Sequence, residues 1–135
     1  MRKISILFWV LATFCIGGHS FGQTRNQTNP DWVLDMASSP VSTVLRDRRD
    51  SFVLTNTSNA EVSKIKLGLV KIEHGRFRVL GKGILVDLQG VLRKGEAILT
   101  PISDYKRTLK DIQSKNAKLS VIYVEFSDGG YWKIS

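Results

Sequence analysis

The chain has almost none of the residues that form disulfides and metal sites. Its one cysteine is Cys15, and its two histidines are His19 and His74. Small exported domains usually depend on disulfides, and zinc sites need several cysteine or histidine ligands. The DxDxD spacing of a calcium loop is absent as well. We therefore expect neither a metal nor a cofactor, and a core that packing stabilises without covalent cross-links.

Residues 1–22 have the pattern of a secretory signal peptide. A short basic start precedes a largely apolar run over residues 4–16, and the small residues that follow offer cleavage after Ser20 or Gly22. A transmembrane helix needs about 18 apolar residues, so this run is too short to span a membrane, and no longer run follows it. We expect export to the periplasm or the extracellular space, with Cys15 removed and no transmembrane segment in the mature form.

Basic residues outnumber acidic ones. The formal charge is +8, and loss of Arg2 and Lys3 with the leader takes away two of these charges, leaving +6. A positive surface attracts acidic partners, although solubility alone also accounts for it. We expect the partner to be a protein or a component of the cell envelope, with an acidic polymer as the alternative and no nucleic acid.

Residues 41–135 have the pattern of short strands separated by turns, behind a polar, flexible lead-in over residues 23–40. Residues 65–69 alternate apolar with other side chains, the period of a strand with one buried face, and over residues 84–88 Ile84, Val86 and Leu88 alternate with Leu85 and Asp87. The alternation slips at Leu69 and Val70, which predicts a bulge or a strand that changes its covered face. Seven or eight such strands in about 100 residues predict an all-β sandwich, with a small barrel as the competing architecture.

Two turns are predicted to close hairpins. His74 and Gly75 suit a two-residue turn, because glycine readily adopts the positive φ that such a turn needs. Residues 127–130 (Ser-Asp-Gly-Gly) connect the most apolar run of the mature chain to a final strand. On that strand Trp132 and Ile134 share one face, which we expect to be buried.

One segment departs from the strand pattern and predicts a short helical crossover over about residues 103–113. Ile102, Tyr105, Leu109 and Ile112 are three or four residues apart, the spacing of one helical face. Ser103 or Asp104 suits the start of this helix and Asn116 its end. The helix would connect two strands that lie in opposite sheets.

Several strand-and-turn segments together resemble a known family. They are residues 52–58, 65–68, 92–96 and 123–132. Over residues 50–135 the chain is similar to the immunoglobulin-like, fibronectin-III-like β-sandwich of secreted bacterial proteins of unknown function. The resemblance implies an antiparallel sandwich of seven to eight strands, without the inter-sheet cysteine pair of antibody domains. It implies nothing about activity, because this fold carries many functions.

No catalytic constellation is recognisable in the mature sequence. A nucleophilic site would have to use His74 at the expected hairpin tip, and no GxSxG element is present. Most of the carboxylates lie in charged runs or turns, where a solvated role is common. We therefore expect a protein that is not an enzyme.

Aromatic residues beside basic ones are the only pattern that points to binding. Alternation along the last strand places Tyr131 and Lys133 outside. Three cations on the expected outer face of the helix, Lys106, Arg107 and Lys110, complete the set of candidate ligand contacts.

Two hypotheses for function follow. The first is a non-catalytic, exported interaction or accessory domain that binds a protein or envelope partner through its loops or an edge strand. The alternative is a binding module for acidic glycans or anionic surfaces, which would use the basic patch and the exposed aromatic residues.

Overall fold

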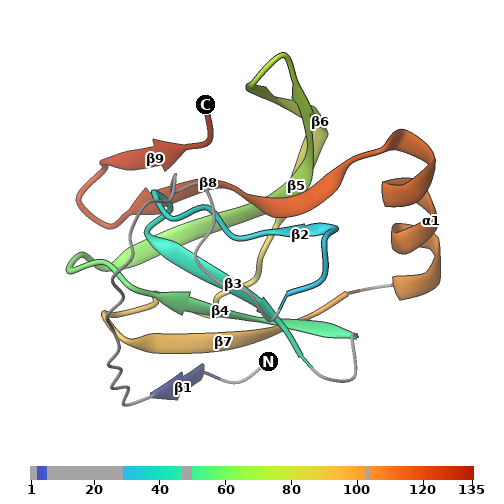
Figure 1. Cartoon of the computed structure of the whole chain (residues 1–135). Helices are drawn as coiled ribbons and strands as arrows, with labels where there is room; N and C mark the ends of the chain where they lie inside the picture. Colours follow the sequence, from blue (N-terminus) through green and yellow to red (C-terminus); the bar gives the residue numbers. More distant parts are fainter. Residues whose placement is uncertain (1–2, 6–28, 47–49, 103) are drawn as a thin grey trace, which may run out of the picture.

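The computed structural model describes residues 3–5, 29–46, 50–102 and 104–135. The rest of the predicted leader, including both proposed cleavage sites, lies outside these residues. The described chain forms two β-sheets, with one α-helix at an end of the molecule (Figure 1). The prediction of an all-β sandwich is confirmed at this level, since the strands form two separate sheets and not a closed barrel.

The first sheet has four antiparallel strands. Their order is β1 (Lys3–Ser5), β7 (Glu96–Pro101), β4 (Ser51–Asn56) and β3 (Val41–Leu45). The β3–β4 ladder is unbroken, from Val41 opposite Asn56 to Leu45 opposite Phe52. Its many β-branched and apolar residues suit a half-buried pleated surface. The residues of β1 fall within the predicted leader.

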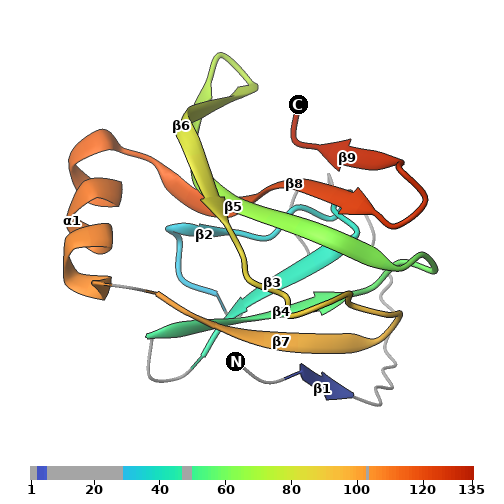
Figure 2. The same cartoon turned by 180° about the vertical axis from the view of Figure 1, so that it is seen from behind.

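The second sheet has five strands. Its order is β2 (Val33–Leu34), β8 (Lys118–Phe126), β5 (Val62–Glu73) and β6 (Arg76–Leu85), while β9 (Tyr131–Lys133) also pairs with β8. β2 runs parallel to β8, and the other pairs are antiparallel. The outer half of the β5–β6 hairpin projects away from the sandwich, as both views show (Figures 1 and 2).

The main hydrophobic core lies between the sheets. The first sheet contributes Phe52, Leu54 and Ile98, and the second contributes Ile65 and Val124, all at most 1% exposed. Full burial of such a side chain contributes about 1.5–3 kcal/mol. The domain can therefore be stable without any disulfide, as its composition requires.

A second, smaller apolar cluster covers the outer face of the five-stranded sheet. Its buried members are Leu34, Met36, Val70, Ile122 and Ile134. Neighbouring residues on a strand point to opposite faces, so Val121 enters the main core while Ile122 enters the outer cluster. Ile122 lies over Gly68, where an added Cβ would come within 2.7 Å of the isoleucine Cδ1. A side chain at this glycine would therefore displace Ile122.

The predicted helical crossover is present as α1 (Tyr105–Lys115), two residues later than predicted at each end. It connects β7 in the first sheet to β8 in the second (Figure 1). Ile112 anchors the helix in the core, and the Tyr105 ring lies 6.1 Å from that of Trp32. Asn116 ends the helix in the left-handed conformation, and its backbone N–H donates to the carbonyls of Ile112 and Gln113.

The β5–β6 hairpin shows the predicted turn, and its register shift differs from a bulge in β5. His74 and Gly75 have φ of 52° and 75°, and positive φ at both positions is the signature of a type I′ turn. The register with β6 shifts between Leu67 and Leu69, but the extra residues lie on β6, and β5 pairs with β8 without a shift from Leu67 to Val70. The slip at Val70 marks a change of the covered face, since Leu67 belongs to the main core and Val70 to the outer cluster.

One strand prediction is wrong. β6 ends at Leu85, so the alternation of residues 84–88 does not belong to one strand. Val86 and Leu88 are buried in the following loop, whereas Ile84 is 73% exposed. Ile84 lies on the edge strand β6, whose outer side pairs with no strand of the described residues, and alternation along a sequence does not reveal which strand is the edge.

The described part of the predicted lead-in, residues 29–40, belongs to the sandwich. The Asn29 amide donates to the carbonyl of Thr43 at 2.8 Å and accepts from the N–H of Leu45 at 2.9 Å. Oδ1 of the buried Asp35 accepts from the N–H of Thr43 at 3.1 Å. These side chains bond to backbone groups of β3 that β4 does not use. The segment whose composition predicted flexibility therefore completes the hydrogen bonding of an edge strand.

Candidate functional site

Large exposed apolar side chains gather on the β5–β6 hairpin. Four of the five in the described chain lie there, namely Ile72 (47% exposed), Val79 (37%), Ile84 (73%) and Leu85 (57%). The fifth is Tyr131 on β9. An edge strand with exposed apolar residues is a natural site for association with another chain.

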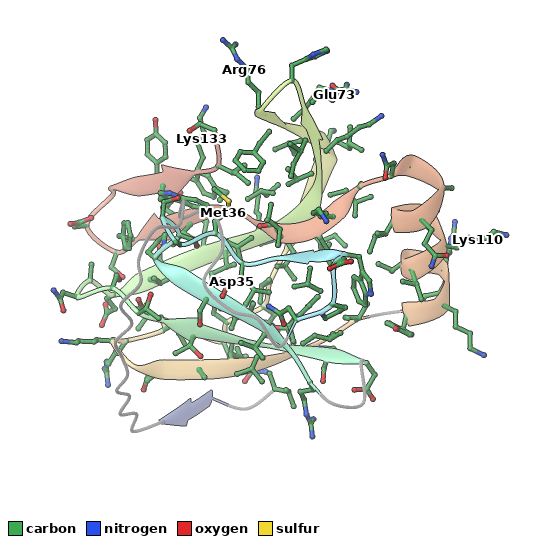
Figure 3. All side chains as sticks on the ribbon, viewed as in Figure 1. Asp35, Met36, Glu73, Arg76, Lys110 and Lys133 are labelled. Carbon is green, nitrogen blue, oxygen red and sulfur yellow. The ribbon has the colours of Figure 1, made fainter. Side chains whose placement is uncertain are left out.

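The exposed edge is also cationic. Lys71 on β5 and three residues of β6, Arg76, Arg78 and Lys82, contribute positive charge, against one carboxylate, Glu73. Figure 3 shows Arg76 and Glu73 at the projecting end of the hairpin. Nε of Arg78 donates to Oε1 of Glu73 at 2.9 Å, and this bond holds the pKa of that carboxyl below its ordinary value. The hairpin therefore keeps a surplus of positive charge.

A surface hollow lies next to the exposed pair at the end of β6. It has a volume of about 390 Å³ and is lined by Ser63 and residues 85–90. Leu85 forms part of its wall, so the hollow extends the apolar edge towards the loop after β6.

A second candidate surface surrounds Tyr131 on the outer face of the five-stranded sheet. The Tyr131 and Tyr123 rings are stacked, with centroids 5.9 Å apart and planes inclined by 23°. Nζ of Lys66 lies 5.5 Å from the centroid of the Tyr123 ring, within the range of a cation–π contact. Lys133 lies directly opposite Tyr123 in the β8–β9 ladder.

Tyr123 is held in place by its own hydroxyl group. The hydroxyl donates a 2.7 Å hydrogen bond to Oε1 of Glu125. This bond, together with partial burial and the nearby negative charge, raises the pKa of the Tyr123 phenol above its ordinary value. Oε2 of Glu125 lies 4.0 Å from Nζ of Lys64.

The predicted ligand contacts do not form one patch. Lys106, Arg107 and Lys110 are exposed on α1. In Figure 3, Lys110 and Lys133 lie on opposite sides of the molecule, and the reverse view keeps α1 and β9 apart (Figure 2). Tyr131 and Lys133 instead lie beside two residues that the sequence analysis did not single out, Tyr123 and Lys66. Cross-strand pairing brings them together, and no local pattern encodes it.

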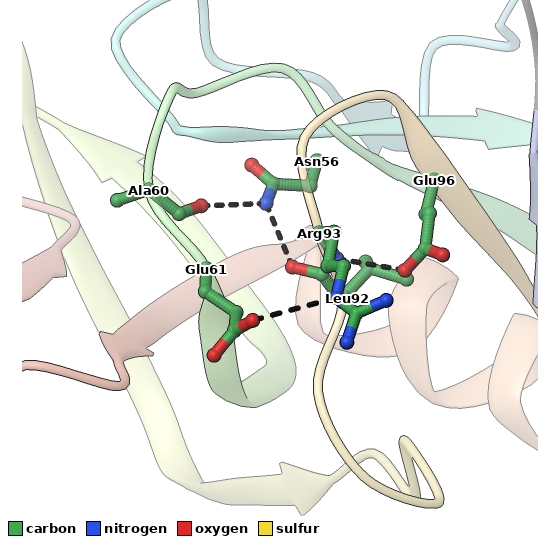
Figure 4. Close-up of polar contacts among 6 residues, drawn as sticks. All are labelled: Asn56, Ala60, Glu61, Leu92, Arg93 and Glu96. Carbon is green, nitrogen blue, oxygen red and sulfur yellow. Dashed lines mark hydrogen bonds and ion pairs between the residues drawn. The ribbon is translucent and has the colours of Figure 1, made fainter.

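A buried polar group links two loops at the end of the sandwich (Figure 4). Nδ2 of Asn56 donates to the carbonyls of Ala60 and Leu92, each at 2.8 Å. Nearby, Nε of Arg93 lies 3.5 Å from Oε2 of Glu61. Asn56 begins an Asn-Thr-Ser glycosylation motif, yet its amide is fully buried and both N–H groups are engaged. We assign Asn56 a structural role.

Comparison of the chain with protein-family models, with curated proteins and with solved structures finds no match in any of the three. No group of three His, Cys, Asp or Glu side chains in the described part of the chain is placed to hold a metal ion. The helix that the structure describes is too short and too polar to cross a membrane.

Proposed function

We propose that the protein is an exported, non-catalytic interaction domain of the immunoglobulin-like type, which pairs its β6 edge with an extended, acidic segment of a partner protein. Export and the lack of catalysis are predictions from the leader pattern and from the residues that the sequence lacks. The mode of binding is inferred from the exposed edge of the second sheet.

The strand order supports the immunoglobulin-like assignment. Strands β3, β4 and β7 correspond to A, B and E of that fold, and β9, β8, β5 and β6 correspond to G, F, C and C′. In this assignment α1 forms the connection between strands E and F. The parallel pairing of β2 with β8 is a departure from the simple order.

The exposure of β6 is the observation that carries the proposal. The strand pairs with β5 on one side, and no strand of the described chain pairs with its other side. Ile84 and Leu85, which point to opposite faces, are both more than half exposed. A partner strand added here would satisfy the free backbone groups, and its own side chains would pack beside Ile84 on one face and beside Leu85 on the other, as in recognition by β-augmentation.

The charges of the hairpin favour an acidic partner over a second copy of this chain. Antiparallel pairing of two β6 strands would bring Arg76, Arg78 and Lys82 of one copy close to the same residues of the other. Like charges placed opposite each other across a ladder are destabilising. Acidic residues in a partner strand would instead meet these cations.

Site-specific photo-crosslinking tests this proposal. A photoreactive amino acid replaces Ile84 in one variant and the exposed helix residue Gln113 in a control, both produced in the native host. We expect crosslinks from position 84 alone, to an acidic segment of one protein. Reversal of charge by Arg78→Glu and Lys82→Glu should abolish them. Equal crosslinking from both positions, or crosslinking only to a second copy, would overturn the proposal.

A further inference from the structure

The outer face of the five-stranded sheet carries a second binding surface that is independent of the β6 edge. We propose that the patch around Tyr131 binds an acidic sugar, with a uronic acid ring stacked on Tyr131 and its carboxylate held by lysines. The patch is defined here by Lys64, Lys66, Tyr123, Glu125, Tyr131 and Lys133. The proposal goes beyond the protein-binding function above and does not depend on it.

Strand register places the six residues of the patch in two rows. Lys66, Tyr123 and Lys133 are direct partners across β5, β8 and β9. The adjacent row has Lys64, Glu125 and Tyr131, again in direct register across the same strands. Residues two apart on a strand point to the same face, so both rows lie on one surface. Tyr123 therefore has Lys66 and Lys133 as its neighbours on the two adjoining strands, and Tyr131 has Lys133 two residues along its own strand.

The aromatic part of the patch is organised before any ligand binds. The hydroxyl of Tyr123 is bonded to Glu125, and its ring is stacked against Tyr131. Tyr131 nevertheless remains 62% exposed. A ring that is held in one orientation while its surface stays open loses little conformational freedom on binding.

The charges of the patch favour an anionic ligand. Three lysines surround a single carboxylate, Glu125, which already interacts with Lys64 and with the Tyr123 hydroxyl. Lys133 has no ion-pair partner within the described chain, so its ammonium group is available. Glu125 repels an anionic group placed directly beside it, so the carboxylate of a bound sugar would lie beside Lys133.

Stacking distinguishes a sugar from a simple anion. The flat face of a pyranose ring presents C–H groups, which pack on the electron-rich face of a tyrosine. Lysine then supplies a charge-assisted hydrogen bond to the carboxylate. A free anion would use the lysines alone and would gain nothing from Tyr131.

A titration monitored by amide NMR shifts tests the proposal. The probe is trigalacturonic acid, the neutral comparison is galactotriose, and anionic phospholipid vesicles and a short single-stranded oligonucleotide are further arms. We expect saturable shifts in β8 and β9 with the acidic trisaccharide, weaker binding of the neutral one, and affinity that falls as salt rises. Tyr131→Ala should lower the affinity about tenfold, in the range found for loss of one stacking aromatic, while Tyr131→Phe should retain most of it.

A charge-matched variant separates a specific site from general attraction. Lys133→Gln and Lys110→Gln each remove one exposed positive charge, but only Lys133 belongs to the patch. We expect the first to weaken binding several-fold and the second to leave it unchanged. Equal losses in the two variants, binding indifferent to Tyr131→Ala, tighter binding to vesicles or oligonucleotide, or no binding at millimolar sugar would each overturn the proposal. Crosslinking from Ile84 reports on the protein-binding edge separately.

Discussion

The buried side-chain amide of Asn56 donates a 2.8 Å hydrogen bond to the carbonyl of Leu92, which lies thirty-six residues further along the chain. The same amide bonds to Ala60, and its oxygen accepts from the N–H and the hydroxyl of Ser58. One side chain therefore fixes the start of β5 against the loop before β7. Every polar atom of this side chain is satisfied, as a fully buried amide requires.

Replacement of Asn56 should destabilise the domain strongly. Asn56→Ala removes the hydrogen bonds that this side chain makes with Ala60, Leu92 and Ser58, and each such bond contributes about 0.5–1.5 kcal/mol, while the Leu92 carbonyl keeps the N–H of Val62. We expect a loss of at least about 2 kcal/mol in the free energy of unfolding, measured by urea denaturation. Asn59→Ala, at an exposed position of the same loop, is the control and should change stability by less than about 0.5 kcal/mol. Equal losses of stability in the two variants would contradict the structural role assigned to Asn56.

The contact between Gly68 and Ile122 predicts that a substitution at Ile122 offsets part of the stability lost by a substitution at Gly68. Gly68→Ala would place a Cβ 2.7 Å from Cδ1 of Ile122, and overpacking of this kind typically costs about 1–3 kcal/mol. Ile122→Val removes that Cδ1. We therefore expect the double variant to lose less stability than the sum of the two single losses, by a coupling of about 1 kcal/mol in a double-mutant cycle. Simple additivity would contradict the contact.

The hydrogen bond from Tyr123 to Glu125 should be visible in an alkaline titration. The pKa of Tyr123 is raised above its ordinary value in the folded state, chiefly by this bond. The bond's contribution to stability is therefore complete below the unfolded-state pKa of about 10, and it is lost as pH rises through the folded-state pKa. Glu125→Gln should lower the Tyr123 pKa. The measurement is phenolate absorbance, with Tyr123→Phe identifying the signal, and an unchanged pKa in Glu125→Gln would refute the assignment.

Ile84 and Val86 should respond differently to the same truncation. The alternating sequence pattern predicts that both lie on the same buried face, yet Ile84 is 73% exposed and Val86 is 6% exposed. Ile84→Ala should leave the free energy of unfolding within about 0.5 kcal/mol of the original. Val86→Ala should cost about 2 kcal/mol, since it leaves a cavity. Similar losses in thermal or urea unfolding would show that Ile84 is covered and would argue against a free β6 edge.

Only part of the candidate binding surfaces was accessible from the sequence. Tyr131 and Lys133 follow from alternation along the last strand, and the structure places both on an exposed face. Their neighbours Lys66 and Tyr123 come from strands distant in sequence, so register alone brings the four together. Lys106, Arg107 and Lys110 are exposed as expected, but the path of the chain carries α1 away from β9.

The sequence by itself determined the local features of this protein. Strands with one buried face, the positive-φ turn at His74 and Gly75, and the helix that ends at Asn116 each depend on residues a few positions apart, and short-range sterics and periodicity govern them. The tertiary structure alone decided which strand lies at the edge, which polar side chains complete β3, and which lysines meet Tyr131. Those outcomes depend on pairing between distant segments, where long-range packing selects one arrangement from several that the local pattern permits.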